Sequence, residues 1–509
     1  MSRRFRASAV NVAATSPLLI AENMSSQPTR PGARPARRSL AAAVLLLAYV
    51  AITALPVLLA WGRGLPPRPW LDELSSALAM TSLMVLAIEF ALSGRIRSVS
   101  SPVGIDAVMR MHQLLARPAL LYLLVHPMMY TLPQAVLPWD DTRAATRMLT
   151  PAATVTGLMA WVLMALLVPA AIFRDRIPYR YETWRLSHAL GAAALMALAI
   201  HHALDTGRYS GAAPLSWLWW LAAALCALAL VNVWGLRPLA MSRKPWRVAR
   251  LERIAPRTWT LALRADGHDG CAYRAGQFAW IKAGSAWRLA DHPFSIASAP
   301  AQGPEIEFLI KEAGDFTAGL PQNVPPGSRV FLDAPYGNFT LDEREGDGLM
   351  LIAGGVGFAP VLSLLRELAA RGERRPVVLV FGNRIAEQII FEDELREIAT
   401  RIDLRTHFVL GEPPAGWAGI TGQLDPDTLR PLLPARPEGW LYFVCGPTPM
   451  IDAVEHALDR AGVPLDQIVA ERFRYDSGRP GRRERQTLLA FGAVALANLL
   501  VAMAFALRS

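Results

Sequence analysis

The sequence predicts a multi-domain membrane protein: an all-α bundle of six transmembrane helices, then a soluble module with an antiparallel β-barrel and an α/β unit. Hydrophobic residues make up 53% and charged residues 18% of the 509 residues, whereas about 25% of a typical soluble chain is charged. Long apolar runs fill residues 39–236. Short β-rich runs, and then alternating strands and helices, fill residues 243–475. An apolar run at 487–507 predicts an extra C-terminal transmembrane helix.

A helix needs about 20 apolar residues to cross a bilayer, and six apolar runs in the first half are close to this length. They occupy 39–61, 71–93, 108–131, 151–173, 186–205 and 215–236. Taken together, the loops after the second, fourth and sixth runs carry more Lys and Arg than the opposite loops. The first set has Arg95, Arg97, Arg174, Arg176, Arg180, Arg185, Arg237, Arg243, Lys244, Arg247 and Arg250, and the second has Arg63, Arg68, Arg143, Arg147 and Arg208. Because short cytoplasmic loops are rich in Lys and Arg, we expect the N-terminus and the soluble module to lie in the cytoplasm. The chain is then an integral protein of the plasma or inner membrane.

Composition narrows the function classes. A net charge of +10 suggests nucleic acid in a soluble chain, but here it indicates basic cytoplasmic loops, so we expect membrane lipid and no nucleic acid as a partner. Cys226, Cys271 and Cys445 are far apart and form no CxxC, which argues against a disulfide framework, a zinc ribbon or a Cys-ligated iron–sulfur cluster. Residues 1–38 predict a flexible basic N-terminal arm. The alternative is a targeting peptide, but no clear apolar stretch and cleavage site precede Ser39.

The soluble module divides at about residue 343. Residues 243–343 predict the barrel, and residues 344–475 predict the α/β domain. Strands are expected at Thr258–Leu263, Phe278–Ile281, Ile306–Ile310, Leu349–Ala353, Val377–Phe381 and Leu441–Cys445, and a helix at Val361–Ala370.

Five of the nine histidines fall in or at the ends of two predicted spans: His112, His126, His188, His201 and His202. His112 and His126 are 14 residues apart, which is almost four helical turns. Their side chains therefore share one face of the helix and lie about 21 Å apart along its axis. The third and fifth spans run parallel. His112 therefore meets His188 near the cytoplasm, and His126 meets His201 or His202 near the outer face. Two stacked bis-histidine sites suit two b-type haems; polar core histidines are the alternative.

The outer ligand on the fifth span stays open at this point. His202 shares the helical face of His188, whereas a 13-residue offset rotates His201 off that face unless the helix bulges. Arg185 either pairs with a haem propionate or is a basic anchor at the membrane surface.

Two motifs in the barrel region suit a flavin. Residues 288–298 read RLADHPFSIAS, in which Phe294 would form an apolar wall for the ring and Ser295 a donor near its N5 atom. Lys311 follows a strand and precedes Gly314-Asp315-Phe316-Thr317. Backbone amides, the Thr317 hydroxyl and Lys311 together could hold a pyrophosphate, although each piece alone could be a barrel turn.

Three motifs in the α/β region suit a nicotinamide dinucleotide. Residues 349–360 read LMLIAGGVGFAP, a buried strand, a Gly-rich turn and a helix N-terminus, which favours a pyrophosphate. Arg384, after the next strand, either contacts an adenosine 2′-phosphate, which leans towards NADPH over NADH, or is a solvated surface charge. Cys445, in the sequence FVCGP, either approaches the nicotinamide or is a buried structural cysteine.

In their order and spacing these motifs resemble those of ferric reductase/NADPH oxidase-type transmembrane flavocytochromes b, over about residues 39–475. The resemblance implies a ferric reductase-like haem domain at 39–236, an FAD-binding barrel at 243–343 and an NAD(P)H-binding domain at 344–475. It implies electron transfer from cytosolic NADPH to FAD, then singly through an inner and an outer haem to an acceptor across the membrane.

The resemblance also assigns residues. His112 and His188 would ligate the inner haem, and His126 and His201 the outer haem, since a 13-residue offset is usual in the family. FAD would be held by His292, Pro293, Phe294 and Ser295, and the nucleotide by Gly354, Gly355, Gly357, Cys445, Gly446 and Pro447.

The C-terminal region departs from the family pattern. The aromatic residue that covers the flavin would be Phe473, but 36 more residues follow it, including the Arg-rich stretch Arg479–Arg485 and the seventh apolar run. We expect the tail to leave the flavin site and dock as a membrane anchor. No EF-hand pattern is present, so direct calcium control by that device is unsupported.

The acceptor stays open between a ferric chelate and O2. Two histidine ligands leave no open iron position, so the acceptor would be reduced at the haem edge. There Arg143 and Arg147 in the outer loop Trp139–Met148 could attract an anionic chelate or superoxide, or be plain solvated charges. Two other hypotheses are a haem-binding subunit that delivers electrons to a partner protein, and a membrane-anchored flavin reductase without haem.

Overall fold

The computed structural model describes residues 33–93, 96–97, 104–131, 151–341, 344–472 and 482–508. Several expectations lie outside these residues. They concern most of the N-terminal arm, Arg95, the outer loop Trp139–Met148 with Arg143 and Arg147, Phe473, and the start of the Arg-rich stretch that follows it.

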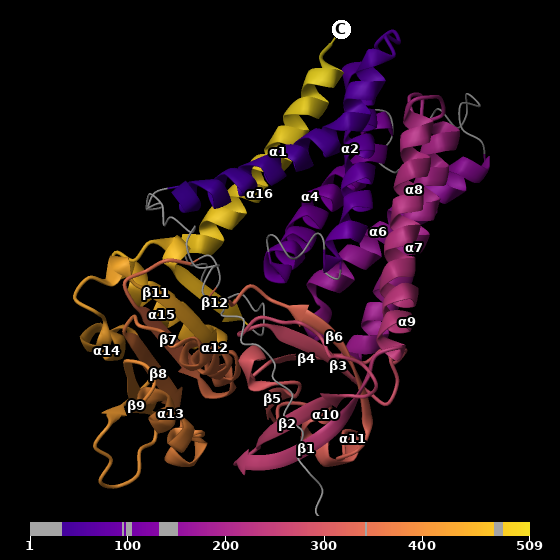
Figure 1. The fold of residues 1–509 in the computed structure, drawn as a ribbon. Coiled ribbons are helices and arrows are strands. Elements are labelled where there is room, and N and C mark those ends of the chain that lie inside the picture. The colour runs from indigo at the N-terminus through magenta and orange to yellow at the C-terminus, as the bar shows by residue number, and fades with distance from the viewer. Residues whose placement is uncertain are drawn as a thin grey trace, which may run out of the picture. The chain divides into compact units, whose positions relative to one another are not determined.

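Each of the seven predicted spans is helical. The helices are α1 Ala33–Gly62, α2 Trp70–Leu92, α4 Ile105–Thr131, α6 Pro151–Ile172, α7 Tyr181–Thr206, α8 Leu215–Val231 and α16 Arg482–Ala506 (Figure 1). Six helices in the described part of the chain are long and apolar enough to cross a membrane. The helix α4 is not among them, because Arg110, His112 and Arg117 interrupt its apolar sequence. The helix α8 continues through a π-helical turn, Asn232–Leu236, into α9, Arg237–Ser242.

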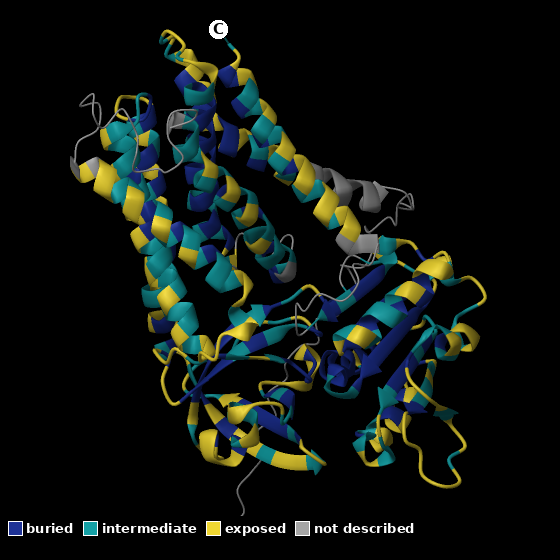
Figure 2. Cartoon of the chain, turned by 180° about the vertical axis from the view of Figure 1, so that it is seen from behind, coloured by how far each residue is buried: buried dark blue, intermediate teal, exposed yellow. Residues whose placement is uncertain are grey.

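The helix α2 lies inside the bundle, and it shows far more buried residues than its neighbours (Figure 2). Its apolar side chains share one core with Val57 of α1, Trp219 of α8 and Phe505 of α16. Close van der Waals contact between such side chains stabilises the packing of helices in a membrane, and interhelical hydrogen bonds add to it.

The C-terminal helix α16 belongs to this bundle. Thr53 donates a hydrogen bond of 2.8 Å to Asn498 across α1 and α16, and the Tyr122 hydroxyl donates to the Ala495 carbonyl oxygen at 3.0 Å. Just after the C-terminal end of α16, Arg508 contacts the buried Glu73 carboxylate of α2 at 3.3 Å. The predicted anchor is therefore packed into the same core as the other helices.

The first part of the soluble module is an antiparallel sheet of order β4-β3-β6-β1-β2-β5. Its strands are β1 Pro245–Ala255, β2 Thr258–Ala265, β3 Phe278–Ala283, β4 His292–Ser295, β5 Ile306–Lys311 and β6 Arg329–Tyr336. An antiparallel bridge between Ile296 and Phe308 joins the two edges. Closure of this kind removes the free edges and makes the sheet a barrel, with Phe308 and Ile310 in its fully buried core.

The second part is a parallel sheet of order β10-β9-β8-β7-β11-β12. Its strands are β7 Leu349–Gly354, β8 Val377–Asn383, β9 Leu404–Leu410, β10 Ile420–Thr421, β11 Leu441–Gly446 and β12 Ile468–Arg472, and its main helices are α12 Phe358–Arg371, α13 Glu392–Ala399 and α15 Thr448–Arg460. The strands β7 and β11 are buried along their whole length, as central strands covered on both faces are.

The helix α12 joins the two sheets. The Ser363 hydroxyl donates to the Ser298 carbonyl oxygen at 2.6 Å, and Arg366 donates to the Ala297 carbonyl oxygen at 2.9 Å. Both carbonyl oxygens lie within three residues of the end of β4. The helix α12, which begins after the Gly-rich turn, is therefore bonded to the segment that follows β4.

Candidate functional site

The Gly-rich turn and the CGP segment meet where the chain order of the parallel sheet reverses. The strands β7 and β11 are neighbours, with Ala353 beside Cys445. A Cβ at Gly357 would overlap the carbonyl oxygen of Cys445, and a Cβ at Gly446 would come within 3.2 Å of the Gly354 nitrogen. Glycine is therefore required by close backbone approach. Ligands of open α/β sheets bind outside such reversal points.

Cys445 lies at this point as a neutral thiol. It is fully buried, and burial, with a smaller contribution from the neighbouring Glu471, raises the pKa of its thiol well above the usual value. A thiol that stays protonated is a poor nucleophile. The residue can thus pack against a ligand but cannot be expected to attack one.

The HPFS strand offers one unpartnered donor. The strand β4 pairs with β3, which places Ser295 opposite Phe278. In the described part of the chain the buried Ser295 hydroxyl has no hydrogen-bond partner. An orphaned hydroxyl is costly unless something else satisfies it, so Ser295 fits a site for a polar atom of a bound flavin.

Aromatic stacking connects the two flavin motifs. The rings of His292 and Phe316 are stacked with centroids 3.8 Å apart and planes 11° apart, and Phe294 lies 6.3 Å from Phe316. Burial lowers the pKa of His292 below its usual value, against the opposing charges of Asp291 and Glu182. His292 is thus a neutral stacking partner near neutral pH.

The GDFT turn is bonded internally. The Thr317 hydroxyl accepts from the backbone nitrogens of Ala313 at 2.8 Å and Gly314 at 2.9 Å. The amide of Gly314, which belongs to the segment expected to face a pyrophosphate, is therefore used within the turn. Lys311 is placed differently, because its Nζ atom lies 4.0 Å from where a Cβ at Gly355 would be. It therefore faces the Gly-rich turn of the neighbouring domain.

Arg384 is exposed at the end of β8. Its guanidinium lies 3.8 Å from the exposed Glu412 carboxylate. A 2′-phosphate would have to compete with that carboxylate, so the local charge does not by itself select NADPH.

The structure brings His112 and His188 together. Their ring centroids are 6.3 Å apart and the ring planes make an angle of 82°. Two imidazoles that share one metal ion at about 2 Å each have their centroids about 6 Å apart. Trp184 stacks on His188 at 5.3 Å. The pair therefore has the spacing of two axial ligands on one iron.

His112 also contacts a buried carboxylate. Its Nδ1 atom lies 2.6 Å from Glu89 of α2. The His112 Nδ1 atom and the two Glu89 carboxylate oxygens have no hydrogen bond of good geometry among the described residues. The ion-pair contact is therefore what connects these two side chains.

The outer histidines face different helices. The Nδ1 atom of His126 lies 2.8 Å from the Ser75 hydroxyl on α2, and that of His201 lies 3.1 Å from the Thr156 hydroxyl on α6. The His202 ring packs against Gly157, where a Cβ would have no room. His201, and not His202, lines a pocket of about 680 Å³ beside α7 and α8. The lining of that pocket does not include His126.

Within the described residues, no cluster of three or more His, Cys, Asp or Glu side chains could hold a metal ion. Two imidazoles are enough to ligate a haem iron, so the pair His112 and His188 would not count as such a cluster.

Among the described residues, three ion pairs join the helical part of the chain to the barrel. Arg185 donates to both carboxylate oxygens of Asp291, at 2.8 and 2.7 Å. Asp333 accepts from Arg97 at 2.8 Å and from Arg237 at 3.2 Å. Arg185 is thus paired with a carboxylate of the barrel, which neither sequence-based expectation for this residue included.

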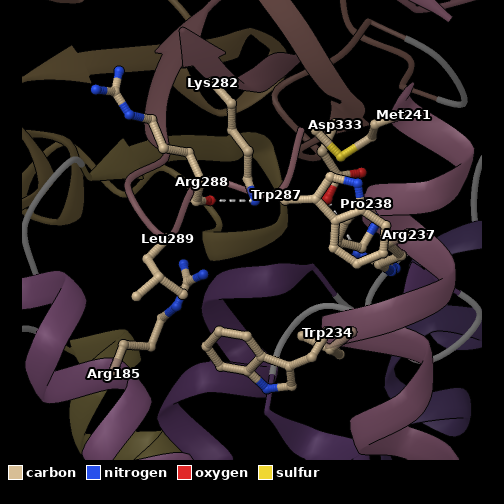
Figure 3. Close-up of a pocket in the computed structure, with 11 residues that line it drawn as sticks. Arg185, Trp234, Arg237, Pro238, Met241, Lys282, Trp287, Arg288, Leu289 and Asp333 are labelled. Carbon is tan, nitrogen blue, oxygen red and sulfur yellow. Dashed lines mark hydrogen bonds and ion pairs between the residues drawn. The ribbon is translucent and has the colours of Figure 1, made fainter. Parts of the chain in front are cut away.

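A small pocket of about 30 Å³ lies at this junction (Figure 3). Arg185 and Trp234 extend into it from the helices, and Lys282 of the barrel bonds the Arg288 carbonyl oxygen at 2.7 Å. The guanidinium of Arg185 lies over the Trp234 ring at 5.1 Å. The junction is therefore lined by cations, two indoles and the Asp333 carboxylate.

Sequence reasoning missed Glu89, Asp291, Asp333 and Ser363. The signal for Asp291 was its place directly before HPFS, and that for Glu89 was an acidic residue inside an apolar span. Their partners are far away in sequence, so nothing in the sequence alone pairs them.

Family models match three segments of the chain. Residues 77–199 match a "ferric reductase like transmembrane component", residues 257–340 an FAD-binding domain, and residues 351–456 an oxidoreductase NAD-binding domain. The three matched segments and their order match a fusion of the ferric reductase/NADPH oxidase type, with a ferric reductase-like transmembrane segment followed by FAD-binding and NAD-binding domains.

Curated relatives share part of the chain. The reductase component of propane 2-monooxygenase from Mycolicibacterium goodii is 34% identical over 187 residues, which is 35% of this chain and 53% of that protein. The corresponding component from Gordonia sp. is 33% identical over 238 residues, 45% of this chain and 66% of that protein. The chain thus spans between half and two thirds of the length of these relatives.

Among solved structures, the cytochrome P450 reductase GcoB of Amycolatopsis is 28% identical, with a TM-score of 0.41 over 45% of this chain and 69% of that one.

Proposed function

We propose that the chain carries electrons from cytosolic NAD(P)H, through FAD and two b-type haems, to an acceptor on the far side of the membrane, either a ferric chelate or O2. The observation that carries the proposal is the 6.3 Å spacing of His112 and His188 inside a ferric reductase-like segment. This pair lies next to helix residues that are ion-paired to the flavin-binding barrel.

The proposed domains keep the expected limits: haem domain 39–236, FAD-binding domain 243–343, NAD(P)H-binding domain 344–475 and C-terminal helix 487–507. The cytoplasmic side is proposed for the module from the basic loops that precede it.

We propose His112 and His188 as the inner haem ligands, and His126 with His201 as the outer ones. The choice of His201 over His202 is supported by two contacts. The Nδ1 atom of His201 is held by Thr156, which leaves Nε2 for a metal, and its ring lines the pocket of about 680 Å³. The His202 ring instead packs against Gly157, with its Nε2 atom 3.5 Å from Thr206.

When bound, flavin and haem supply the conversion of a two-electron donor into single-electron transfers. The residues of this chain position those groups. The glycines of the Gly-rich turn and Gly446 let a dinucleotide approach the sheet, Lys311 adds positive charge there, and Cys445 packs beside the nicotinamide as a neutral thiol. Ser295 donates to the flavin edge, and the Arg185–Asp291 ion pair fixes the haem helix relative to the flavin strand.

A second candidate is delivery of electrons to a partner protein. It is favoured by one observation: the relatives from Mycolicibacterium goodii and Gordonia sp. are reductase components of a monooxygenase. In that case the purified chain would reduce small acceptors slowly until its partner is added.

The test uses the full chain in detergent and histidine variants. His112→Leu and His188→Leu should each lose one haem and block transfer from NADPH to the remaining haem, whereas His201→Leu should lose the other haem. His456→Leu, at an exposed position of α15, is the matched control and should retain both. Full haem content in the inner-pair variants would contradict the assigned ligands. Full NADPH-driven activity in these variants, in a chain that holds no haem, would contradict the proposal and favour a flavin reductase without haem.

A further inference from the structure

A polar stripe on α2 faces the helix that carries two of the proposed ligands. Ser75, Ser82 and Glu89 are seven residues apart, so they share one face of α2. Ser75 contacts His126, and Glu89 contacts His112. Ser82 lies between them, and its buried hydroxyl has no hydrogen-bond partner among the described residues. The helix α2 thus provides an oxygen atom at the level of each proposed haem.

The contacts share one atom type. In His112, His126 and His201 it is Nδ1 that lies against an oxygen atom of a neighbouring helix. A partner on one ring nitrogen fixes the ring orientation and directs the other nitrogen, Nε2, to a metal. Glu89, Ser75 and Thr156 are therefore placed as positioning residues, not as ligands.

The two levels differ in the chemistry of the partner. At the inner level it is a carboxylate. At the outer level the partners are uncharged oxygen atoms: the hydroxyl and the backbone carbonyl of Ser75 at His126, and the Thr156 hydroxyl at His201. Glu89 is only 6% exposed inside the bundle and has His112 as its contact. A carboxylate in this position is costly unless positive charge lies nearby. A ferric haem on His112 supplies that charge, and a ferrous haem supplies less.

We propose that this asymmetry orders the two haem potentials. The Glu89 carboxylate makes His112 a more basic ligand and stabilises the ferric state of the inner haem, which lowers its midpoint potential. The hydroxyl partners at His126 and His201 do so less, so the outer haem has the higher midpoint and electrons run outward. This inference rests on the proposed function, because it assumes a haem at each level.

The test is a redox titration of the haem α band of the full chain in detergent, with electron paramagnetic resonance spectra of the ferric state. Glu89→Gln keeps the size of the side chain and removes the charge. It should raise the midpoint potential of the inner haem by about 59 mV, which corresponds to about a tenfold change in the one-electron equilibrium constant. The midpoint of the outer haem should not change. The inner haem is identified as the one missing from His112→Leu.

Two comparison variants separate this role from a structural one. Ser82→Ala removes a polar group from the same face of α2 without touching a proposed ligand, and should move neither midpoint. Ser75→Ala should change the signal of the outer haem alone. If Glu89→Gln fails to retain haem, Glu89→Asp carries the comparison, since it keeps the charge but withdraws it from His112, and the inner midpoint should again rise.

An unchanged inner midpoint in the variant that retains haem overturns the inference, as does an outer haem with the lower midpoint in the wild type. Those results leave the proposed function standing. A preparation without bis-histidine haem would instead contradict the proposed function itself.

Discussion

The Arg185 guanidinium donates to both carboxylate oxygens of Asp291, at 2.8 and 2.7 Å, and so joins α7 to the residue directly before β4. Arg185 precedes His188 by three residues, and Asp291 directly precedes His292. Asp291 has a fully buried side chain and Arg185 is 19% exposed. Breaking a buried ion pair by removing one partner costs about 3–5 kcal/mol, since the other charge is left unpaired.

We predict that Asp291→Asn slows electron transfer from flavin to haem by about 10²-fold, because small displacements of reacting groups cost about that much. Reduction of the flavin by NADPH should be nearly unchanged. Stopped-flow absorbance follows the two steps separately. The charge-exchanged double variant Arg185→Asp with Asp291→Arg should recover part of the lost rate. Equal slowing of both steps would show that the ion pair supports the whole module rather than this junction.

The Gly-rich turn gives a second prediction. Gly357→Ala should abolish nucleotide binding while FAD stays bound, because the new Cβ would overlap the Cys445 backbone. Isothermal titration with NADP⁺ and the flavin absorbance of the purified chain measure the two effects. Gly492→Ala in α16, where a Cβ meets nothing within 4 Å, is the control. Undiminished nucleotide affinity in Gly357→Ala would remove this turn from the site.

Ser295 should show opposite effects on stability and activity. Its buried hydroxyl has no partner among the described residues, so Ser295→Ala should stabilise the flavin-free protein by about 1 kcal/mol. The same variant should slow hydride transfer to bound flavin, since a donor at its edge is lost. Thermal melting with and without FAD, and the rate of flavin bleaching, test both expectations. A melting temperature that falls without FAD would contradict the assignment.

The stacked His292 predicts a pH dependence. Burial lowers the pKa of His292 below its usual value of 6.5, so the unfolded chain binds more protons than the folded chain in the window below pH 6.5. The free energy of unfolding should therefore fall as the pH falls through that window. His292→Gln should show a shallower decrease when melting is followed by release of flavin fluorescence. Parallel curves for the two proteins would show that His292 does not titrate on unfolding.

Much of the architecture follows from sequence. Strands form at each expected position, for example Leu349–Gly354 where Leu349–Ala353 is predicted, because buried parallel strands are continuous apolar runs bounded by glycine. The proximity of His112 and His188 is predictable as well, since the two spans that carry them run parallel and each histidine lies near the start of its span.

The rest depends on tertiary partners. Periodicity favoured His202, whereas the contacts with Thr156 and Gly157 favour His201, and those partners belong to another helix. The amides of the GDFT turn were expected to face a ligand but bond to Thr317, which is a local competition that spacing does not reveal. The pairing of Asp291 with Arg185 spans 106 residues, and no local pattern encodes it.

Anaerobic mixing of the detergent-solubilised full chain with NADPH, followed at the haem Soret and α bands, shows whether electrons pass from NADPH through flavin to haem. We predict that the flavin bleaches first and that two haems per chain are then reduced in sequence. Ferric citrate or air, admitted next, should reoxidise them, and the faster of the two identifies the acceptor. Haem that stays oxidised with NADPH but is fully reduced by dithionite would contradict the proposed path from flavin to haem within this chain.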